Sequence, residues 1–485
     1  MVDLLRTPEA GGRVVRGGLI RGIGFAISTV AGLATAVLLL RYLDVREFGL
    51  YATVGAILGI VAGITDAGLT AVGSREISVA RTPRERAGIL HHLLVLRIGG
   101  AGIGVIAGVT FTVIAGYDRV VVAGTVLGGL GVILISVQSM LTLPIWVELR
   151  IITLTALEVL RNVLTLVGVA ALVAIGAGLV AFFGVQVVAG VVLIPTTLVL
   201  ARFGVRAAGG VRREVLFRLV RQTLPLAVAF AMSVIYFRVL VVLVSLFSTE
   251  EQTGIFGTSF RIFELLLGLP ALVLSVALPL LSVAGAEDDE RLRKGLQSMT
   301  EASLLIAALL VVGIAILAEP GIRLIGGEQY LEAAPVLRIQ ALALIPVFVG
   351  QVWQLGLIAG RAQRAMAIAN GLALVVVIVL GVSLVPAGGA RAAAWVAVVA
   401  EVALATFLFI ALGRMRPGCA PTLWCAWKVG LAMALAGAIG YGLRDWPVAA
   451  AGAAVVVFTI VAVGTRAVPA DAYHAFGLRR GREDE

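Results

Sequence analysis

The chain has 485 residues, of which 60% are hydrophobic and only 14% are charged. This composition excludes a soluble protein of the same length, because a water-soluble fold cannot cover so much apolar surface. The formal charge of +10 does not by itself indicate a nucleic-acid partner. In a membrane protein the informative quantity is how the positive charge is divided between the two sides of the membrane.

Fourteen hydrophobic segments follow one another with short loops between them, and each is long enough to cross a bilayer as a helix. The first is too long for the apolar core of a signal peptide and lacks a small-residue cleavage site, so we expect it to be retained. The segments lie at approximately 18–40, 49–71, 91–115, 120–142, 153–175, 180–201, 222–247, 254–283, 297–317, 333–359, 365–385, 392–413, 424–443 and 446–465.

Lysine and arginine are distributed unevenly between the loops. If the N-terminus is inside, the inner segments hold 25 of these residues, the outer loops hold six, and seven lie within the hydrophobic segments. Inner loops of membrane proteins carry such an excess. The sequence therefore predicts a multi-pass protein of the cell (plasma or inner) membrane with both termini in the cytoplasm.

The chain also divides near its middle. Val211–Arg221 predicts a basic amphipathic helix on the inner leaflet, because its apolar residues share one helical face. Residues 46–51 and 251–256 are weakly similar, and both follow the first helix of a set of six, which indicates two parallel half-repeats with a site between them. The expected parts are an N-terminal lobe at 1–210, a linker at 211–221, a C-terminal lobe at 222–413, and two further helices with a tail at 414–485.

Several classes of enzyme are excluded by what the sequence lacks. The only lysines, Lys294 and Lys428, do not follow the glycine pattern of a P-loop, so ATP hydrolysis by that route is excluded. No Ser-His-Asp, HExxH or Cys/His pattern is present. Cys419 and Cys425 have no metal-ligating neighbours and are interpreted as reduced and incidental. We therefore predict no catalytic residue, no metal site and no cofactor.

Basic residues inside the hydrophobic segments are the main functional signal. A guanidinium at bilayer depth costs roughly 2.5–3.5 kcal/mol, so it usually faces protein, water or an anionic ligand. A protein that keeps several of them is expected to enclose a positively charged cavity. The residues are Arg21, Arg97, Arg161, Arg238, Arg261, Arg338 and Lys428.

Three charged residues share a depth near the middle of the membrane. Arg238 precedes the turn at Thr249–Glu251 by about twelve residues, and Arg261 and Glu264 follow it by about eleven and fourteen. One interpretation is a structural ion pair of Glu264 with either arginine. The other leaves one arginine to bind an anionic group of the cargo.

A second group of charges is expected near the cytoplasmic side. Arg21 and Asp66 lie at similar distances from the first turn, so Arg21 either pairs with Asp66 or extends to the inner surface. Arg97 lies one or two turns into its segment and is a candidate for substrate binding. Glu158 and Arg161 are three residues apart and are expected to neutralise each other.

Polar residues in the second half complete the candidate site. Glu401 stands almost alone in its segment and is either hydrogen-bonded or a protonatable coupling residue. Gln351, Gln354 and Asn370 offer hydrogen bonds that suit a sugar. The predicted substrate-binding residues are thus Arg238, Arg261, Arg21, Arg97, Gln351, Gln354 and Asn370, and the predicted pairing or coupling residues are Glu264, Asp66 and Glu401.

Three stretches resemble one protein family, the polysaccharide-biosynthesis flippases of the multidrug/oligosaccharidyl-lipid/polysaccharide exporter superfamily. Leu43–Tyr51 is similar to their turn after the first helix, and Asp66–Leu69 to their D-x-G-L segment. Glu251–Ser282 is similar to their eighth helix, including Gly254, Arg261, Pro270 and Pro279.

This resemblance implies an all-α fold with two pseudo-symmetric six-helix lobes around a central cavity that opens to each membrane face in turn. It implies outward movement of a polyprenyl-diphosphate-linked glycan. The implied partners are that lipid-linked glycan, membrane lipids and other membrane proteins of polysaccharide assembly. The two extra C-terminal helices resemble those of lipid II flippases, where such a pair borders a groove for the lipid tail.

Two other functions are weighed against a flippase. A cation-coupled multidrug exporter of the same superfamily should have a cavity rich in Asp and Glu, whereas the segments here hold seven basic residues and four acidic ones. A membrane-embedded glycan polymerase needs catalytic carboxylates or a large outer domain, and the outer loops are short. The count therefore favours a transporter of an anionic cargo.

Overall fold

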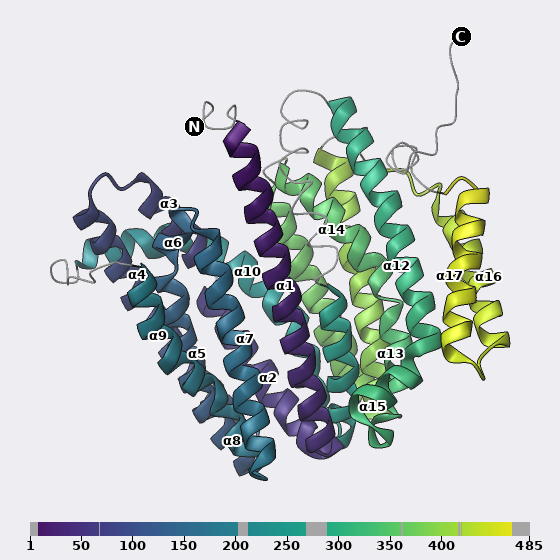
Figure 1. The fold of residues 1–485 in the computed structure, drawn as a ribbon, viewed down its shortest axis with the longest axis horizontal. Coiled ribbons are helices and arrows are strands. Elements are labelled where there is room, and N and C mark those ends of the chain that lie inside the picture. Colours follow the sequence, from purple (N-terminus) through teal and green to yellow (C-terminus); the bar gives the residue numbers. More distant parts are fainter. Residues whose placement is uncertain are drawn as a thin grey trace. The chain divides into compact units, whose positions relative to one another are not determined.

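A computed structural model describes residues 8–66, 68–201, 212–267, 289–359, 362–415, 418 and 420–467. These residues form helices joined by short turns, and none of them lies in a β-strand (Figure 1). The predicted all-α, multi-pass architecture is confirmed. The chain forms two compact units, Met1–Arg238 and Val239–Glu485.

Helices of the first unit pack in pairs that are distant in sequence. The first helix lies along the seventh, the second contacts the fourth and fifth, and the fifth also contacts the ninth (Figure 1). In chain order the helices are α1 (Pro8–Tyr42), α2 (Val45–Asp66), α3 (Leu69–Val79), α4 (Pro83–Ile114), α5 (Arg119–Leu141), α6 (Leu143–Val147), α7 (Ile151–Ala174), α8 (Leu179–Phe183), α9 (Val185–Ala201) and the first part of α10 (Arg213–Phe247).

Glycines allow the helices of this unit to approach closely. A Cβ atom on Gly104 of α4 would lie 2.8 Å from Val61 Cγ1 of α2. On α5, a Cβ on Gly128 would lie 2.5 Å from Leu58 Cδ1. Any larger side chain at these positions would push α4 and α5 away from α2. These three helices carry four of the polar residues that line the cavity described below: Asp66, Arg97, Ser136 and Ser139.

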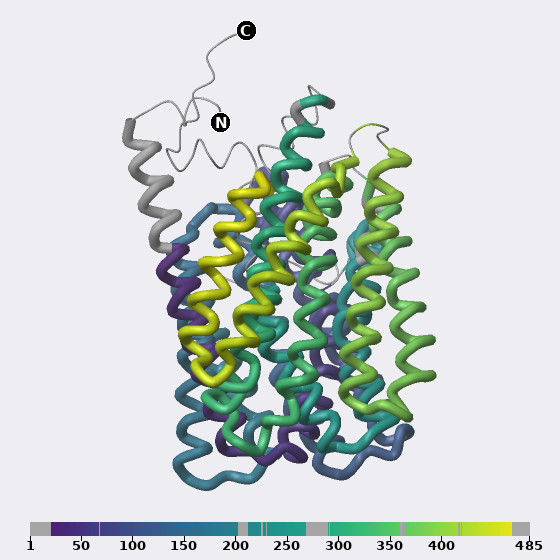
Figure 2. The backbone as a smooth tube through the Cα atoms, turned by 90° about the vertical axis from the view of Figure 1, so that its right-hand side faces the viewer, coloured from purple at the N-terminus to yellow at the C-terminus, as the bar shows by residue number. Residues whose placement is uncertain are grey.

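The second unit is built around a long helix that contacts several others. This helix, α12 (Asp289–Gly326), packs against the fourteenth helix and against the last two, which form a hairpin beside it (Figure 2). The unit also contains the end of α10, a helix at 250–267, η2 (Glu328–Tyr330), α13 (Ala333–Ala341), α14 (Leu344–Ala359), α15 (Gln363–Met415), α16 (Ala426–Gly442) and α17 (Pro447–Gly464).

Each of the fourteen predicted segments overlaps a helix in the described part of the chain. By length and hydropathy, 11 helices are candidates to cross a membrane. This number is lower than fourteen for two reasons that the helices show. Helix α15 covers two predicted segments, which meet at the non-helical Gly389 (φ 53°, ψ −137°). Helix α16 has only 17 residues. Residues 268–283 of the eighth segment lie outside the described residues.

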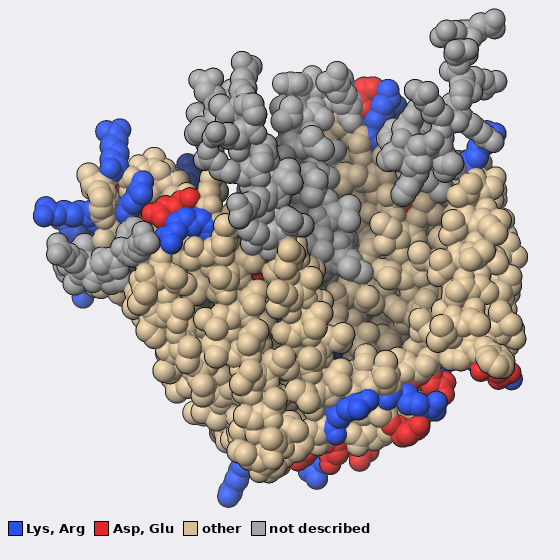
Figure 3. Space-filling view, in the orientation of Figure 1, with Lys and Arg blue, Asp and Glu red and all other residues tan. Residues whose placement is uncertain are grey.

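Charged side chains are unevenly distributed over the surface of the protein. On the face shown in Figure 3, Lys, Arg, Asp and Glu gather near the upper and lower edges, and most of the coloured surface between them belongs to uncharged residues. This pattern is that of helices whose middle parts contact lipid.

The predicted linker does not form a separate helix. Residues 213–221 are continuous with the following spanning segment in α10, and the division of the chain into two units falls within that helix, after Arg238. The domain boundaries expected at residues 210, 221 and 413 stay predictions.

Candidate functional site

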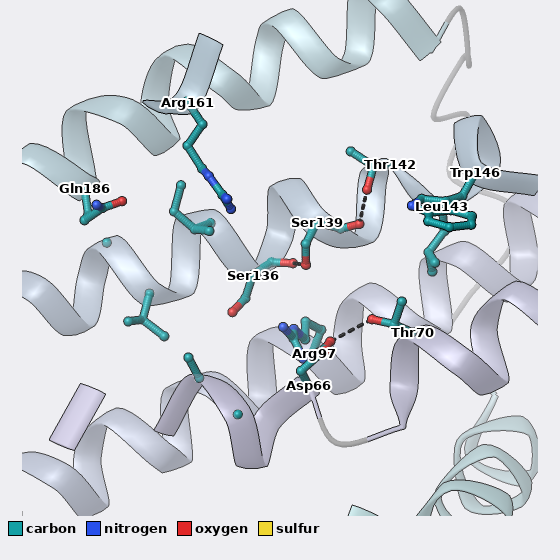
Figure 4. A pocket seen from close by; sticks show the side chains of 15 residues that line it. Asp66, Thr70, Arg97, Ser136, Ser139, Thr142, Leu143, Trp146, Arg161 and Gln186 are labelled. Carbon is teal, nitrogen blue, oxygen red and sulfur yellow. Dashed lines mark hydrogen bonds and ion pairs between the residues drawn. The ribbon is translucent and has the colours of Figure 1, made fainter. Parts of the chain in front are cut away.

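A cavity of about 550 Å³ lies within the first unit, between α2, α4, α5, α7 and α9 (Figure 4). Its charged lining residues are one aspartate and two arginines, and serine, threonine and glutamine supply further polar groups. The polar lining residues are Asp66, Thr70, Arg97, Ser136, Ser139, Thr142, Arg161 and Gln186.

Asp66 is placed by a break in the backbone. Helix α2 ends at Asp66, and Gly68 then adopts a left-handed conformation with φ 79° before α3 begins. A residue with a Cβ is disfavoured at that φ, which explains the glycine of the D-x-G-L segment. The break leaves the Asp66 carboxylate at the end of a helix, where the Thr70 hydroxyl donates to it at 2.7 Å.

The partner of Asp66 is Arg97. Nη1 of Arg97 lies 2.8 Å from Oδ1 of Asp66, and the Arg97 side chain is only 5% exposed whereas that of Asp66 is 49% exposed. The buried Nε of Arg97 has no hydrogen-bond partner among the described residues. Arg97 therefore depends on Asp66 for compensation of its charge.

This pairing corrects one of the two expectations for Arg21. Arg21 lies exposed on α1, which packs along α7, and Asp66 pairs with α4 instead. Distance from a turn gives the depth of a residue, but it does not give the side of the helix on which the residue lies.

Arg161 lies on the opposite wall of the cavity. Its side chain extends from α7 toward Ser136 and Ser139 of α5 (Figure 4). The expected ion pair with Glu158 is wrong: no described acidic residue lies within 4 Å of the Arg161 guanidinium, and Glu158 is exposed. The cavity offers Arg161 a polar environment that the spacing of the two residues does not reveal.

Ser136, Ser139 and Gln186 are lining residues that the sequence analysis missed. The Ser139 hydroxyl donates to the carbonyl of Ser136 at 2.9 Å, and the Thr142 hydroxyl donates to that of Ser139 at 2.6 Å. Hydroxyls three residues apart in an apolar segment lie on one helix face, so the spacing was the available signal. With two guanidinium groups and one carboxylate, the cavity suits an anion, which arginine can bind in a bidentate manner.

Arg238 lies against a glycine of α2. A Cβ atom on Gly59 would lie 2.5 Å from both Cδ and Nε of Arg238, so the side chain occupies the space that the glycine leaves. One turn earlier, at Gly55, no atom lies within 4 Å of such a Cβ. Gly59 therefore positions Arg238.

The remaining predicted residues lie in the second unit. Arg261 Nη1 forms an ion pair with Glu264 Oε2 at 2.8 Å, which is one of the two pairings left open by the sequence. Asn370 is buried and donates through Nδ2 to the carbonyl of Met366 at 3.0 Å. The half-buried residues of this set are Gln351 and Gln354 on α14 and Glu401 on α15. Roles for these residues in substrate binding or coupling stay predictions.

Comparison with known proteins identifies the family. Residues 38–335, more than half of the chain, match the model of a family described as polysaccharide biosynthesis protein. The chain belongs to this family. No curated protein matches the sequence.

Solved structures similar to this polysaccharide biosynthesis family member are membrane transporters. The lipid II flippase MurJ in an inward closed conformation has a TM-score of 0.76 at 13% identity, covering 95% of this chain and 100% of MurJ. An inward-facing multidrug resistance MATE family transporter of the MOP superfamily has a TM-score of 0.66 at 18% identity, covering 82% and 97%. At such identities the likeness shows the fold alone, and it confirms the predicted fold class.

A third similar structure also belongs to a transporter. A MOP superfamily transporter from Pyrococcus furiosus, described as having a binding pocket of reverse polarity, has a TM-score of 0.56 at 17% identity, covering 86% and 97%. For that protein the polarity of the pocket suggests a different function.

Proposed function

We propose that this protein is a flippase that moves polyprenyl-diphosphate-linked oligosaccharide from the inner to the outer leaflet by alternating access, for cell-surface polysaccharide biosynthesis. The observation that carries the proposal is the cavity in a membrane-spanning unit, where Arg97 and Arg161 outnumber the single carboxylate of Asp66. Membership of a polysaccharide biosynthesis family supports the glycan as cargo.

The diphosphate of the cargo has the chemistry that this cavity suits. Asp66 holds Arg97 in place at 2.8 Å, so little side-chain entropy is lost when an anion approaches. Arg161 presents a planar fork that can donate two parallel hydrogen bonds to phosphate oxygens. Ser136, Ser139 and Gln186 line the same cavity and can bond the remaining oxygens or the first sugar.

The protein acts in this proposal as a transporter and not as an enzyme. Arg238 and Arg261 remain proposed contacts of the cargo in addition to the cavity residues. Energy for the cycle is proposed to come from an ion gradient, with Glu401 as the coupling residue. Its partners are the lipid-linked glycan, membrane lipids and other membrane proteins of polysaccharide assembly.

A multidrug exporter is the second candidate, and the fold favours it because a MATE transporter is among the similar structures. A lipophilic cation would be attracted by a surplus of carboxylates, and this cavity has a surplus of guanidinium groups. The charge of the lining thus separates the two candidates.

Deletion of the gene tests the proposal. We expect a lipid-linked glycan to accumulate on the inner leaflet and surface polysaccharide to decrease, with both restored by the wild-type gene. Unchanged glycan together with increased sensitivity to lipophilic cations would establish the exporter instead.

The orientation of the chain gives a second test. In a background without Cys419 and Cys425, we expect Ala115→Cys to react with an impermeant thiol reagent added outside. We expect Ser78→Cys to react only after permeabilisation, because the two positions flank opposite ends of α4 (Pro83–Ile114) and the charge asymmetry places α3 inside. The reverse pattern would invert the proposed direction of transport.

Gly59→Ala should impair transport through Arg238. The new methyl group would occupy the space of Cδ and Nε, so we expect transport of the lipid-linked glycan to fall as far as in Arg238→Ala, roughly tenfold. Gly55→Ala on the same helix is the control, since its methyl group meets no atom within 4 Å. Equal transport by Gly59→Ala and Gly55→Ala would show that Arg238 does not contribute to the site.

Glu401→Gln tests the coupling. If Glu401 changes protonation in the cycle, the variant should insert normally but transport should no longer respond to an imposed proton gradient. A wild-type response of the variant to that gradient would exclude Glu401 as the coupling residue.

A further inference from the structure

A second cavity, of about 640 Å³, lies in the other unit at one end of α12, α13 and the α16–α17 hairpin. Charged residues line one part of it, which we call the mouth: Glu319, Arg323, Arg338, Arg444 and Asp445. Near the mouth α16 contacts α12, since a Cβ atom on Gly440 would overlap with the side chain of Ile316. One turn away, at Gly437, no atom lies within 4 Å of where a Cβ would be. The cavity therefore has open space beside Gly437, where its lining is apolar.

Two charges at the mouth belong to adjacent residues, and neither has an ion-pair partner in the described part of the chain. The Arg444 guanidinium lies 5.3 Å from the centre of the Tyr441 ring and donates to the Tyr441 hydroxyl at 3.3 Å. Asp445 follows it directly and lines the same cavity. One cation and one anion, neither of them in an ion pair with a described residue, thus line the same cavity.

The other charges of the mouth are partly neutralised. Arg323 pairs with Glu328 at 2.8 Å, and Arg338 donates to the Ala315 carbonyl at 3.1 Å. Glu319 is held only loosely, at 3.6 Å from Arg338 and 3.9 Å from Arg323. Glu319 can therefore accept a further hydrogen bond, and the cavity has no large surplus of either charge.

The position of the mouth fits the boundary between lipid and water. Tyr441 and Trp446 beside it are 71% and 73% exposed, as expected for aromatic residues at the membrane interface. Helix α17 begins at Pro447, which lines the cavity, and a helix N-terminus favours a phosphate.

From these contacts we propose that the cavity binds the headgroup of a phospholipid that carries both a phosphate diester and a primary ammonium group. Arg444 and the N-terminus of α17 bind the phosphate. Asp445 and Glu319 accept hydrogen bonds from the ammonium group. An acyl chain follows the apolar face at Gly437, between α12 and α16. This site is separate from the arginine-containing cavity of the first unit and binds a resident lipid of the bilayer instead of the cargo.

Native mass spectrometry of the delipidated, full-length protein tests this site, with phosphatidylethanolamine and phosphatidylglycerol as probes. The wild type should retain phosphatidylethanolamine as its first lipid in preference to phosphatidylglycerol. Arg444→Ala should weaken binding of both lipids about tenfold, because both lose the phosphate contact. Asp445→Asn should weaken only phosphatidylethanolamine, because phosphatidylglycerol has no ammonium group.

Arg414→Ala is the matched control, since Arg414 is also exposed but lies at the opposite end of the same unit, at the end of α15. It should bind both lipids as the wild type does. Equal binding of phosphatidylethanolamine by Arg444→Ala and the wild type would overturn the proposal. So would an Asp445→Asn variant that retains the preference for phosphatidylethanolamine.

Discussion

Asp66→Ala is expected to destabilise the protein by about 3 kcal/mol, because it leaves a buried guanidinium without its counter-charge. Arg97 is 5% exposed and lies 2.8 Å from the carboxylate that would be lost. The loss should appear as a lower midpoint of thermal unfolding in detergent. Asp118→Ala is the control and should unfold as the wild type does, since Asp118 is exposed and makes no side-chain cap.

The double variant Asp66→Ala/Arg97→Leu separates pairing from packing. Removing both charges should recover most of the lost stability, because replacing a buried ion pair with apolar groups is often neutral. If Arg97 binds cargo, the double variant should not transport it even though its stability is recovered. An Asp66→Ala variant that unfolds as the wild type does would show that Arg97 does not depend on this carboxylate.

Arg161→Ala should have the opposite effects: it should weaken binding of the cargo strongly and change the stability of the protein little. Because no described carboxylate pairs with Arg161, its loss should leave the unfolding midpoint nearly unchanged. The dissociation constant for a soluble polyprenyl-diphosphate analogue should rise roughly tenfold to a hundredfold, the effect of losing a hydrogen bond to a charged group. Arg161→Lys should recover only part of the affinity, since an ammonium group cannot form the bidentate contact.

Arg119→Ala provides the comparison, because Arg119 is exposed at the start of α5 and does not line the cavity. It should bind the analogue as the wild type does. If Arg161→Ala also does so, the positive charge of the cavity has a structural role only.

The helices were predictable from sequence because each hydrophobic run is long and is bounded by charged residues. The break at Gly389 divides α15 where the sequence predicts a loop between two segments. Short breaks such as the one at Gly184, between α8 and α9, could not be predicted, because they fall within one apolar run and do not change its hydropathy.

Pairing of charges was predictable only in part. The sequence left Glu264 to pair with either Arg238 or Arg261, and the structure shows the pair with Arg261, three residues away. The same spacing of three residues gave the wrong pair for Glu158 and Arg161. Neighbours on one helix are known from the sequence, whereas the polar wall that Arg161 faces comes from α5. The Asp66 pair was missed for a related reason, since its partner lies on a helix whose rotation the sequence does not fix.

Translocation in reconstituted proteoliposomes tests directly whether this protein is a flippase and whether Arg161 binds its cargo. A polyprenyl-diphosphate-linked glycan is placed in the vesicles, and the fraction that becomes accessible to a lectin outside is followed with time. We expect vesicles with the wild type to expose the glycan faster than protein-free vesicles. Vesicles with Arg161→Ala should expose it at a rate close to that of protein-free vesicles, and those with Arg161→Lys at an intermediate rate. Equal rates for the wild type and Arg161→Ala, or for the wild type and protein-free vesicles, would contradict these expectations.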